Sequence, residues 1–433
     1  MKITIVGTGY VGLTSAACLA ELGHEILCLD VDEKKIASLI QGNVPFFEPG
    51  LDQLLKRNSA RKKLQFTTDK KQAIEFGEVI FNCVGTPSGP NGEADLSAVF
   101  SVAKDIAQTT EKIGTYKILV IKSTVPPGTS RKIQEIVDTS NSKIDVVSNP
   151  EFLREGEAIR AFQYPDKIVL GSHSDKALRI MRKVYAGRLR TYLPIVETDW
   201  ETAELIKYAS NAMLATRIST INEIANICDH VNADIKIVST ALGMDYRIGP
   251  RFLNAGVGWG GSCFPKDVKA LIHTAKQHGY DAKLFEQTYA VNDRQRIRII
   301  EKIKTVMNIE NKTFCIWGLS FKPKTSDMRE APSITIINEL LKHKATVQVY
   351  DPEAMNEAKK IFNTKVTYSK NPEEAAKDAH AIILVTEWDE FRGIDFAQLK
   401  KTMKDNKLFD GRNIYEPELI KEEGFEYYGM GRK

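Results

Sequence analysis

The chain has 433 residues, of which 42% are hydrophobic and 27% charged, the composition of a globular protein too long for one ordinary core. Its 60 basic and 56 acidic residues are mixed along the chain and give a net charge of +4. This even distribution excludes a nucleic-acid partner, which needs basic residues concentrated on one face. No apolar run approaches the ~20 residues of a membrane span, and early glycines interrupt any signal peptide. We therefore expect two or three domains and no membrane partner.

The six cysteines are scattered, with no CxxC pair and no cluster at zinc spacing. Five lie in apolar runs, where a reduced thiol behaves as a small hydrophobe: Cys18, Cys28, Cys83, Cys228 and Cys315. Cys263 differs because it lies in a glycine-rich loop. We expect a reduced, cytoplasmic enzyme without a metal site.

The first segment alternates short apolar runs with helical patterns. A helix is predicted at 11–22, and strands at 3–6, 25–29, 79–84, 118–121 and 144–147. Strands separated by helix-length stretches indicate βαβ units and a parallel sheet.

The segment 7–12, GTGYVG, fits the GxGxxG pattern between the first strand and the first helix. Its glycines permit a tight turn, a close approach to a pyrophosphate and close packing of helix and strand. Asp30 ends the next strand near the spacing of a ribose-binding acid, and with Asp32 it would repel the 2′-phosphate of NADP, although Lys35 tempers this. NAD is therefore predicted. The alternative is a glycine-rich turn that binds nothing.

Two later segments place polar groups after strands. KSTVPPG follows one strand at 122–128, and NPEFLREG follows the next at 149–156. Glu151 and Glu155 would share one face if their segment were helical, and such a pair could do acid–base work. Two solvated acids on a loop are the alternative.

A long helix is predicted at 200–231, a stretch without Gly or Pro. At ~1.5 Å per residue it would be about 48 Å long, and its broad apolar face suggests a partner subunit. Lys207 and Asn211 lie four residues apart on it. They are either functional groups or a solvated polar stripe.

The loop 254–267, NAGVGWGGSCFPKD, carries the strongest chemical signal. Pro265 suits the first turn of a helix that extends to about His278. Cys263 would then precede a helix N-terminus with Lys266 nearby, and both features lower the pKa of a thiol. Asp267 could order a water. A structural cysteine in a tight loop is the alternative.

The last third repeats the plan of the first. Strands are predicted at 313–317, 346–350 and 381–385, with a helix at 334–341. The fold class is thus α/β, with two Rossmann-like doubly wound parallel-sheet domains joined by a long central helix. The predicted limits are 1–198 for the NAD-binding domain, 199–300 for the central helical domain and 301–433 for the second Rossmann-like domain.

The order of the motifs resembles the UDP-glucose/GDP-mannose dehydrogenase family over nearly the whole chain. The matching blocks are GTGYVG, VGTP, KSTVPPGT, NPEFLREGEAI, KYASNA, RIGPRFLNAGVGWGGSCFPKD, FKPKTSDMREAPS and FDGRN. GGSCFPKD is highly specific, whereas GxGxxG alone is not. Two blocks, NPEFLREGEAI and RFLNAGVGWGGSCFPKD, resemble the UDP-glucose branch of the family more than its GDP-mannose and N-acetylmannosamine branches. Trp259 departs from the Phe or Tyr expected at its position.

The resemblance implies oxidation of a sugar C6 alcohol to an acid, with two NAD and one water. Cys263 would form a thiohemiacetal and then a thioester, which is hydrolysed by water that Asp267 and a carboxyl group such as Glu151 or Glu155 position. Lys207 and Asn211 would stabilise the negative oxygen, and Thr124 would hold a water or the nicotinamide end.

The family pattern also assigns each residue to a ligand. The implied catalytic residues are Cys263, Lys207, Asn211, Asp267, Glu151 and Thr124. The implied cofactor contacts are Gly7, Gly9, Tyr10, Val11, Gly12, Asp30, Lys35, Thr86, Thr124, Glu155, Lys266 and Arg329. The implied substrate contacts, for UDP-glucose, are Glu151, Phe152, Leu153, Arg154, Lys207, Asn211, Arg247, Phe252, Asn254, Gly256, Gly260, Lys322 and Arg412. Arg247 reaches across from a neighbouring subunit in this family, which favours a homodimer. The second Rossmann-like domain, which lacks GxGxxG, would bind UDP.

Three other functions remain open from the sequence. The same chemistry could act on a UDP-N-acetyl sugar or on GDP-mannose. A single-step alcohol dehydrogenase would form one NADH per sugar and tolerate loss of Cys263. A regulatory NAD-binding module would form none, although it would have no need of the Cys–Lys–Asp cluster.

Overall fold

The computed structural model of the chain describes residues 1–186 and 194–432. Two compact units are present: Met1–Ser210 with Lys269–Tyr280, and Asn211–Val268 with Asp281–Lys433. Helices α9 (Trp200–Val231) and α11 (Phe264–Gln277) each contribute residues to both units.

The first unit contains an eight-stranded sheet in the order β3-β2-β1-β4-β5-β6-β7-β8. Its strands are β1 (Lys2–Val6), β2 (Glu25–Leu29), β3 (Leu64–Thr67), β4 (Val79–Asn82), β5 (Lys117–Ile121), β6 (Ile144–Ser148), β7 (Ile168–Gly171) and β8 (Ile195–Thr198). The sheet is parallel from β3 to β6, as the βαβ pattern predicts. β7 joins β6 in the antiparallel direction through Ser148 and Gly171, and β8 is parallel to β7. The order therefore reverses between β1 and β4, the usual position of a ligand in such a sheet.

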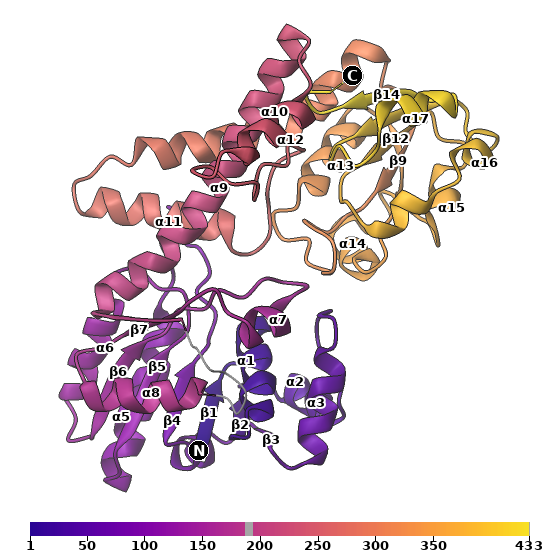
Figure 1. Ribbon diagram of the computed structural model, residues 1–433. Helices are drawn as coiled ribbons and strands as arrows, with labels where there is room; N and C mark the ends of the chain where they lie inside the picture. The colour runs from indigo at the N-terminus through magenta and orange to yellow at the C-terminus, as the bar shows by residue number, and fades with distance from the viewer. Residues whose placement is uncertain (187–193, 433) are drawn as a thin grey trace. The chain divides into compact units, whose positions relative to one another are not determined.

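Helices cover both faces of this sheet (Figure 1). They are α1 (Tyr10–Glu21), α2 (Glu33–Ile40), α3 (Leu51–Ala60), α4 (Lys70–Phe76), α5 (Ser97–Ile113), α6 (Thr129–Asp138), α7 (Ala158–Gln163) and α8 (Asp175–Tyr185). One apolar core joins the sheet to α1, α3 and α8, and another joins it to α4, α5 and α6. The central strands are buried on both faces, which explains their continuous apolar runs.

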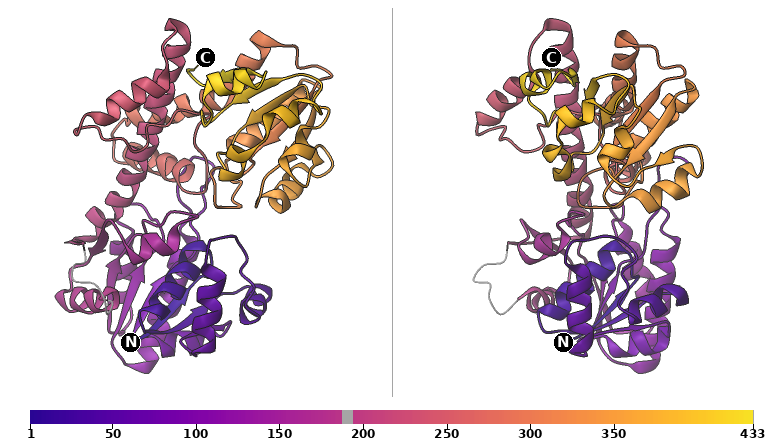
Figure 2. Two further views of the ribbon diagram at one scale, coloured as in Figure 1. Left: turned by 45° about the vertical axis from the view of Figure 1, so that its right-hand side comes forward. Right: turned by 90° about the vertical axis from the view of Figure 1, so that its right-hand side faces the viewer.

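The second unit contains a six-stranded parallel sheet in the order β11-β10-β9-β12-β13-β14. Its strands are β9 (Thr313–Trp317), β10 (Thr346–Tyr350), β11 (Thr367–Tyr368), β12 (Ala381–Leu384), β13 (Lys407–Asp410) and β14 (Glu426–Gly429). Two apolar cores again lie on its two faces, and Figure 2 shows the covering helices in two further views. They are α13 (Pro332–Lys342), α14 (Met355–Phe362), α15 (Pro372–Ala376), α16 (Phe396–Lys400) and α17 (Pro417–Glu422), with the 3₁₀ helix η1 (Asp389–Gly393).

The helical middle of the chain is formed by α9, α10 (Ile235–Met244), α11 and α12 (Lys283–Val306). The predicted limits of α9 are confirmed at both ends, because no residue inside it breaks the backbone hydrogen-bond pattern. The predicted helix after Cys263 is confirmed: it begins at Phe264, so that Pro265 lies in its first turn, and it ends at Gln277. Within residues 1–186 and 194–432, no helix has the length and apolar composition needed to cross a membrane.

Candidate active site

In the first unit, the predicted cofactor residues follow the carboxyl ends of adjacent parallel strands. Gly7 follows β1, Asp30 follows β2, Thr86 comes after β4 and Thr124 after β5. Because parallel strands end at the same edge of a sheet, these residues gather around the point where the strand order reverses. The Thr86 hydroxyl donates to the Thr124 carbonyl over 2.9 Å, which joins the loops after β4 and β5.

The GTGYVG loop has the geometry that a pyrophosphate requires. Gly7 has φ +94°, and a Cβ on Gly12 would lie 1.9 Å from the Gly7 carbonyl oxygen, so helix and loop pack too closely for a side chain. A Cβ on Gly9, by contrast, would meet no atom within 4 Å. No side chain caps α1 at Gly9 and no acidic residue occupies its first turn. The start of α1 is therefore open at Gly9 and has no side-chain cap there, and its helix dipole favours an anion.

Asp30 is anchored by Thr8 of this loop and by Lys35 of α2. Its carboxylate accepts from the Thr8 amide at 2.8 Å, the Thr8 hydroxyl at 2.6 Å and Lys35 Nζ at 3.0 Å. Burial alone would raise the pKa of Asp30, but the hydrogen bonds from Thr8, Lys35 and Asp32 outweigh it and lower the pKa to about 2. A fixed negative charge therefore stands at the end of β2.

A buried ion pair joins the segment after β6 to α9. Lys207 Nζ lies 2.9 Å from Glu151 Oε1, and the two side chains are 4% and 6% exposed. Burial alone would raise the pKa of Glu151, but Lys207 outweighs it, with help from the Leu153 amide and Lys122, and the pKa is lowered. Glu151 is thus a carboxylate, able to accept a proton. The Lys207 ammonium also lies 5.5 Å from the centre of the Phe152 ring.

The condition under which Glu151 and Glu155 would share one helical face is not met. Residues 151–157 are not helical, and α7 begins at Ala158. Four-residue spacing therefore does not place the two carboxylates on one helical face. Glu151 is buried, whereas Arg154 in the same segment is exposed and pairs with Asp166 at 3.1 Å.

Two buried side chains that sequence reasoning left without a role support these loops. Lys122 Nζ donates to Asn149 Oδ1 at 3.2 Å and to Tyr185 Oη at 3.2 Å, which joins the ends of β5 and β6. Glu204 on α9 accepts from the amides of Gly128 and Ser130, each at 2.7 Å, at the start of α6. Burial raises the pKa of Glu204 to about 7, although these hydrogen bonds act against it. Their only sequence signal is a charged residue within an otherwise apolar pattern.

In the second unit, Cys263 lies immediately before α11. Its carbonyl accepts from the Asp267 amide at 2.8 Å, the first hydrogen bond of the helix, so Cys263 occupies the position before the helix N-terminus as predicted. Cys263 is partly exposed, whereas the other five cysteines are buried, and none of the six forms a disulfide bond. A helix N-terminus favours a thiolate at this position.

Asp267 is held by two neighbours that sequence reasoning also selected. Its Oδ1 accepts from Lys266 Nζ at 2.6 Å and its Oδ2 from Asn211 Nδ2 at 2.6 Å. Asp267 is 1% exposed. Asn211, on α9, is 56 residues away in sequence, and the fold brings its amide to the first turn of α11.

The glycine-rich loop before Cys263 is packed tightly against the second Rossmann-like domain. A Cβ on Gly260 would lie 2.1 Å from the Glu330 carbonyl oxygen. Trp259 is buried, and its indole N–H donates to Ser219 at 3.0 Å. Trp259 is therefore a structural anchor of the loop.

The predicted nucleotide residues of the second sheet also follow strand ends. Lys322 comes after β9, and Arg412 after β13. Arg412 Nε donates to the Val385 carbonyl at 2.7 Å, while Arg412 Nη1 lies 3.2 Å from the Gly258 carbonyl. Arg412 thus joins this sheet edge to the glycine-rich loop.

Asp351, at the end of β10, corresponds in position to Asp30 but has a different role. It is 1% exposed, and its Oδ2 accepts from the amides of Leu319 and Ser320 and from the Trp388 indole. A Cβ on Gly318 would meet Thr386 at 2.4 Å. The loop after β9 is thus filled by the protein, which argues against a second dinucleotide site.

Three models of one family match successive parts of the chain. The UDP-glucose/GDP-mannose dehydrogenase family's NAD binding domain matches residues 1–188, its central domain 201–294 and its UDP binding domain 315–417. The chain belongs to this family.

Relatives of known name agree with this membership in the UDP-glucose/GDP-mannose dehydrogenase family. A UDP-glucose 6-dehydrogenase of Rhizobium meliloti (strain 1021) is 45% identical, over all of both chains. One of Bacillus subtilis (strain 168) is 43% identical over all of this chain and 93% of its own. A solved UDP-glucose dehydrogenase of Pyrobaculum islandicum has a TM-score of 0.93 at 32% identity, covering 100% of this chain and 98% of its own.

NAD is the cofactor of this family member, and the first unit fits it. The open space at Gly9 and the free start of α1 suit the pyrophosphate, and the ionised Asp30 suits a ribose hydroxyl and opposes a 2′-phosphate. The predicted contacts Lys266 and Arg329 belong to the second unit, where Arg329 pairs with Asp327 at 2.8 Å.

Proposed function

We propose that the chain oxidises UDP-glucose to UDP-glucuronate in two steps, with Cys263 as the covalent nucleophile. The observation that carries this proposal is the partly exposed Cys263 thiol at the start of α11. One helical turn on, Asp267 is held by Asn211 and Lys266. A one-step alcohol dehydrogenase has no need of such a group.

The residues act on the sugar in sequence. NAD, which the GTGYVG loop and Asp30 would hold, would supply the hydride acceptor for both oxidations at C6. The Cys263 thiolate adds to the C6 aldehyde carbon: the C–S bond forms, the carbonyl π bond breaks, and the oxygen takes up the proton released in the first oxidation to become the hydroxyl of a thiohemiacetal. The second oxidation leaves a thioester at the same carbon.

Hydrolysis then releases the acid. Water adds to the thioester carbon and loses a proton, the C–S bond breaks, and Cys263 departs as the thiolate. The buried carboxylates Asp267 and Glu151 are the candidates to orient this water and accept its proton. Lys207 and Asn211 are proposed as donors to the negative oxygen, and removal of such a donor typically costs about 2.7–4 kcal/mol in the transition state.

We also propose that the nucleotide is bound by the second sheet and that the active form is a cytoplasmic homodimer. Lys322, Arg412, Phe252 and Asn254 are the proposed UDP contacts. The apolar residues Met213, Ile227 and Val231 are 57%, 54% and 64% exposed on α9 and, at helical spacing, form one stripe. Such a stripe suits a second copy of the chain. Six cysteines that form no disulfide bond suit a reducing compartment.

The proposed dimer also gives a role to Arg247, in the exposed turn after α10. Tyr246 is 93% exposed, and the adjacent Arg247 forms a two-bond pair with Asp245. An arginine presented in this way could reach the nucleotide of the partner copy. The expected mass in light scattering is twice the 48.5 kDa of one chain. A charge introduced by Ile227→Glu should shift it to one chain.

The decisive experiment is the NADH yield from a limiting, known amount of UDP-glucose with excess NAD. Two NADH per sugar are expected, with glucuronate as the product. One NADH per sugar would leave a single-step dehydrogenase. None with UDP-glucose, but two with GDP-mannose or a UDP-N-acetyl sugar, would assign the same chemistry to another substrate.

A further inference from the structure

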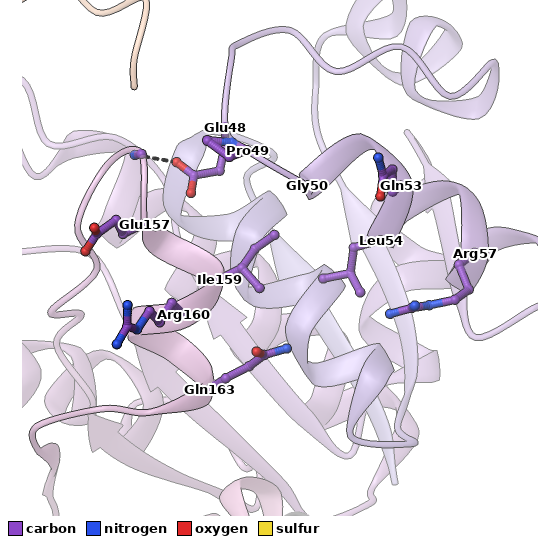
Figure 3. A pocket seen from close by; sticks show the side chains of 11 residues that line it. Glu48, Pro49, Gly50, Gln53, Leu54, Arg57, Glu157, Ile159, Arg160 and Gln163 are labelled. Atoms are coloured by element: carbon purple, nitrogen blue, oxygen red, sulfur yellow. Dashed lines mark hydrogen bonds between the residues drawn. The ribbon is translucent and has the colours of Figure 1, made fainter. Parts of the chain in front are cut away.

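Glu48, in the loop between α2 and α3, is a buried carboxylate that no motif singled out. It is 5% exposed. It accepts a hydrogen bond from the Tyr10 hydroxyl, and it accepts from the amides of Gly156 at 2.6 Å and Ala158 at 2.7 Å. Figure 3 shows the carboxylate directed toward the segment that leads into α7.

The first connection leads to the dinucleotide loop. Tyr10 is the first residue of α1 and directly follows Gly9. Its ring packs against Phe46, with 5.0 Å between the ring centres. Burial and the Glu48 carboxylate raise the pKa of Tyr10 well above its ordinary value, so its hydroxyl remains a donor to Glu48. Glu48 therefore fixes the side chain that stands at the phosphate end of α1.

The second connection leads to the segment 151–157. Gly156 and Ala158 lie at its end, and the Ala158 amide is one of the N–H groups at the start of α7 that have no partner within the helix. A carboxylate at this position satisfies the amide and interacts favourably with the helix dipole. The segment begins at Glu151, which Lys207 holds. Glu48 thus fixes one end of the segment and Lys207 the other.

A cavity of about 400 Å³ lies beside Glu48, between α3 and α7. Glu48, Glu157 and Arg160 are among the residues that line it (Figure 3). None of its lining residues is a predicted cofactor or substrate contact. Glu157, an exposed carboxylate on this cavity, therefore offers a matched control for Glu48.

We propose that Glu48 is a positioning residue that couples the dinucleotide loop to the segment 151–157, so that NAD and the nucleotide sugar strengthen each other's binding. The inference rests on the proposed function and on the family pattern, which implies that Tyr10 contacts the cofactor and residues 151–154 contact the sugar. The Glu48 carboxylate accepts from one donor beside the dinucleotide loop and from two donors at the end of the segment 151–157. When a ligand orders either region, it therefore favours the ligand-bound position of the other. A glutamine could not replace it, because its NH₂ group would face one of the donors.

The test compares the affinity for NAD, measured by calorimetry, with and without saturating UDP-glucuronate as an unreactive sugar ligand. In the wild type, UDP-glucuronate should lower the Kd for NAD by at least about five-fold. Glu48→Gln should remove most of this coupling and raise KM for both substrates more than it lowers kcat. Glu157→Gln should keep the wild-type coupling.

A second variant keeps the test decisive if Glu48→Gln fails to fold. Tyr10→Phe retains the ring and removes only the hydroxyl, and it should lower the coupling at least about two-fold. Unchanged coupling in either folded variant, or no coupling in the wild type, would overturn the role of Glu48. A wild type that forms no NADH from UDP-glucose would instead refute the proposed function, which separates the two outcomes.

Discussion

The Lys207 ammonium and the Glu151 carboxylate lie 2.9 Å apart and are both buried, although 56 residues separate them in the sequence. The pair ties α9 to the segment after β6, and it keeps Glu151 ionised because the lysine outweighs the effect of burial on its pKa. The same contact therefore orders the site and sets its charge.

Removing the lysine should leave an uncompensated buried carboxylate. Lys207→Met is expected to lower the free energy of unfolding by about 3–5 kcal/mol, measured by urea denaturation. The double variant Lys207→Met/Glu151→Gln should recover part of this loss because no buried charge remains. Lys70→Met breaks an exposed pair with Asp105 and should cost less than about 1 kcal/mol. Equal losses for the two lysines would contradict the importance of burial.

Replacing Cys263 should separate cofactor binding from chemistry. Cys263→Ala is expected to abolish glucuronate formation, because no thioester forms, while the Kd for NAD stays within about two-fold of the wild type. The measurements are product analysis by chromatography and NAD titration by calorimetry. Cys228→Ala, which removes a buried thiol outside the site, should still give two NADH per sugar. Near-normal acid production by Cys263→Ala would falsify the covalent mechanism.

Removing Asp30 should relax the choice of cofactor. Asp30→Ala deletes the carboxylate that opposes a 2′-phosphate and releases Lys35, now 3.0 Å from it, to pair with that phosphate. The ratio of kcat/KM for NADP to that for NAD should rise by at least about ten-fold. Glu33→Ala, a neighbouring acid in the first turn of α2, should leave the ratio unchanged. An unchanged ratio in Asp30→Ala would show that other residues discriminate between NAD and NADP.

Glu204 should contribute a pH dependence to stability. Its pKa in the folded protein is raised from 4.5 to about 7, so the folded state binds this proton more tightly than the unfolded state. The contribution is therefore fully present below pH 4.5 and is lost as the pH rises through about 7. Glu204→Gln removes the titration.

The measurement is the difference in unfolding free energy between the wild type and Glu204→Gln from pH 5 to 8. The wild type should lose stability relative to the variant as the pH rises. Glu201 is a neighbouring carboxylate that pairs with Arg131, and this pairing lowers its pKa. Glu201→Gln should therefore not reproduce this slope. A difference that is flat across this range would show that Glu204 is ionised throughout.

Local patterns along the chain predict most of the architecture. The buried strands, the glycine loop before α1 and the limits of α9 follow from residue spacing, because backbone hydrogen bonds connect near neighbours. The place of Cys263 before α11 follows in the same way, from Pro265 and the glycines. The carboxyl ends of parallel strands then predict that Gly7, Asp30, Thr86 and Thr124 share one edge.

Only the tertiary structure decided which charged groups meet. Spacing suggested a pairing of Glu151 with Glu155, whereas the fold pairs Glu151 with Lys207. Glu48, which holds Tyr10 and the start of α7, belongs to no motif. Such contacts join residues far apart in sequence, and their energy comes from burial that a single sequence does not reveal. The sequence by itself therefore determined the elements and the chemical type of the site, and the packing of distant segments decided the charge and the connections of its carboxylates.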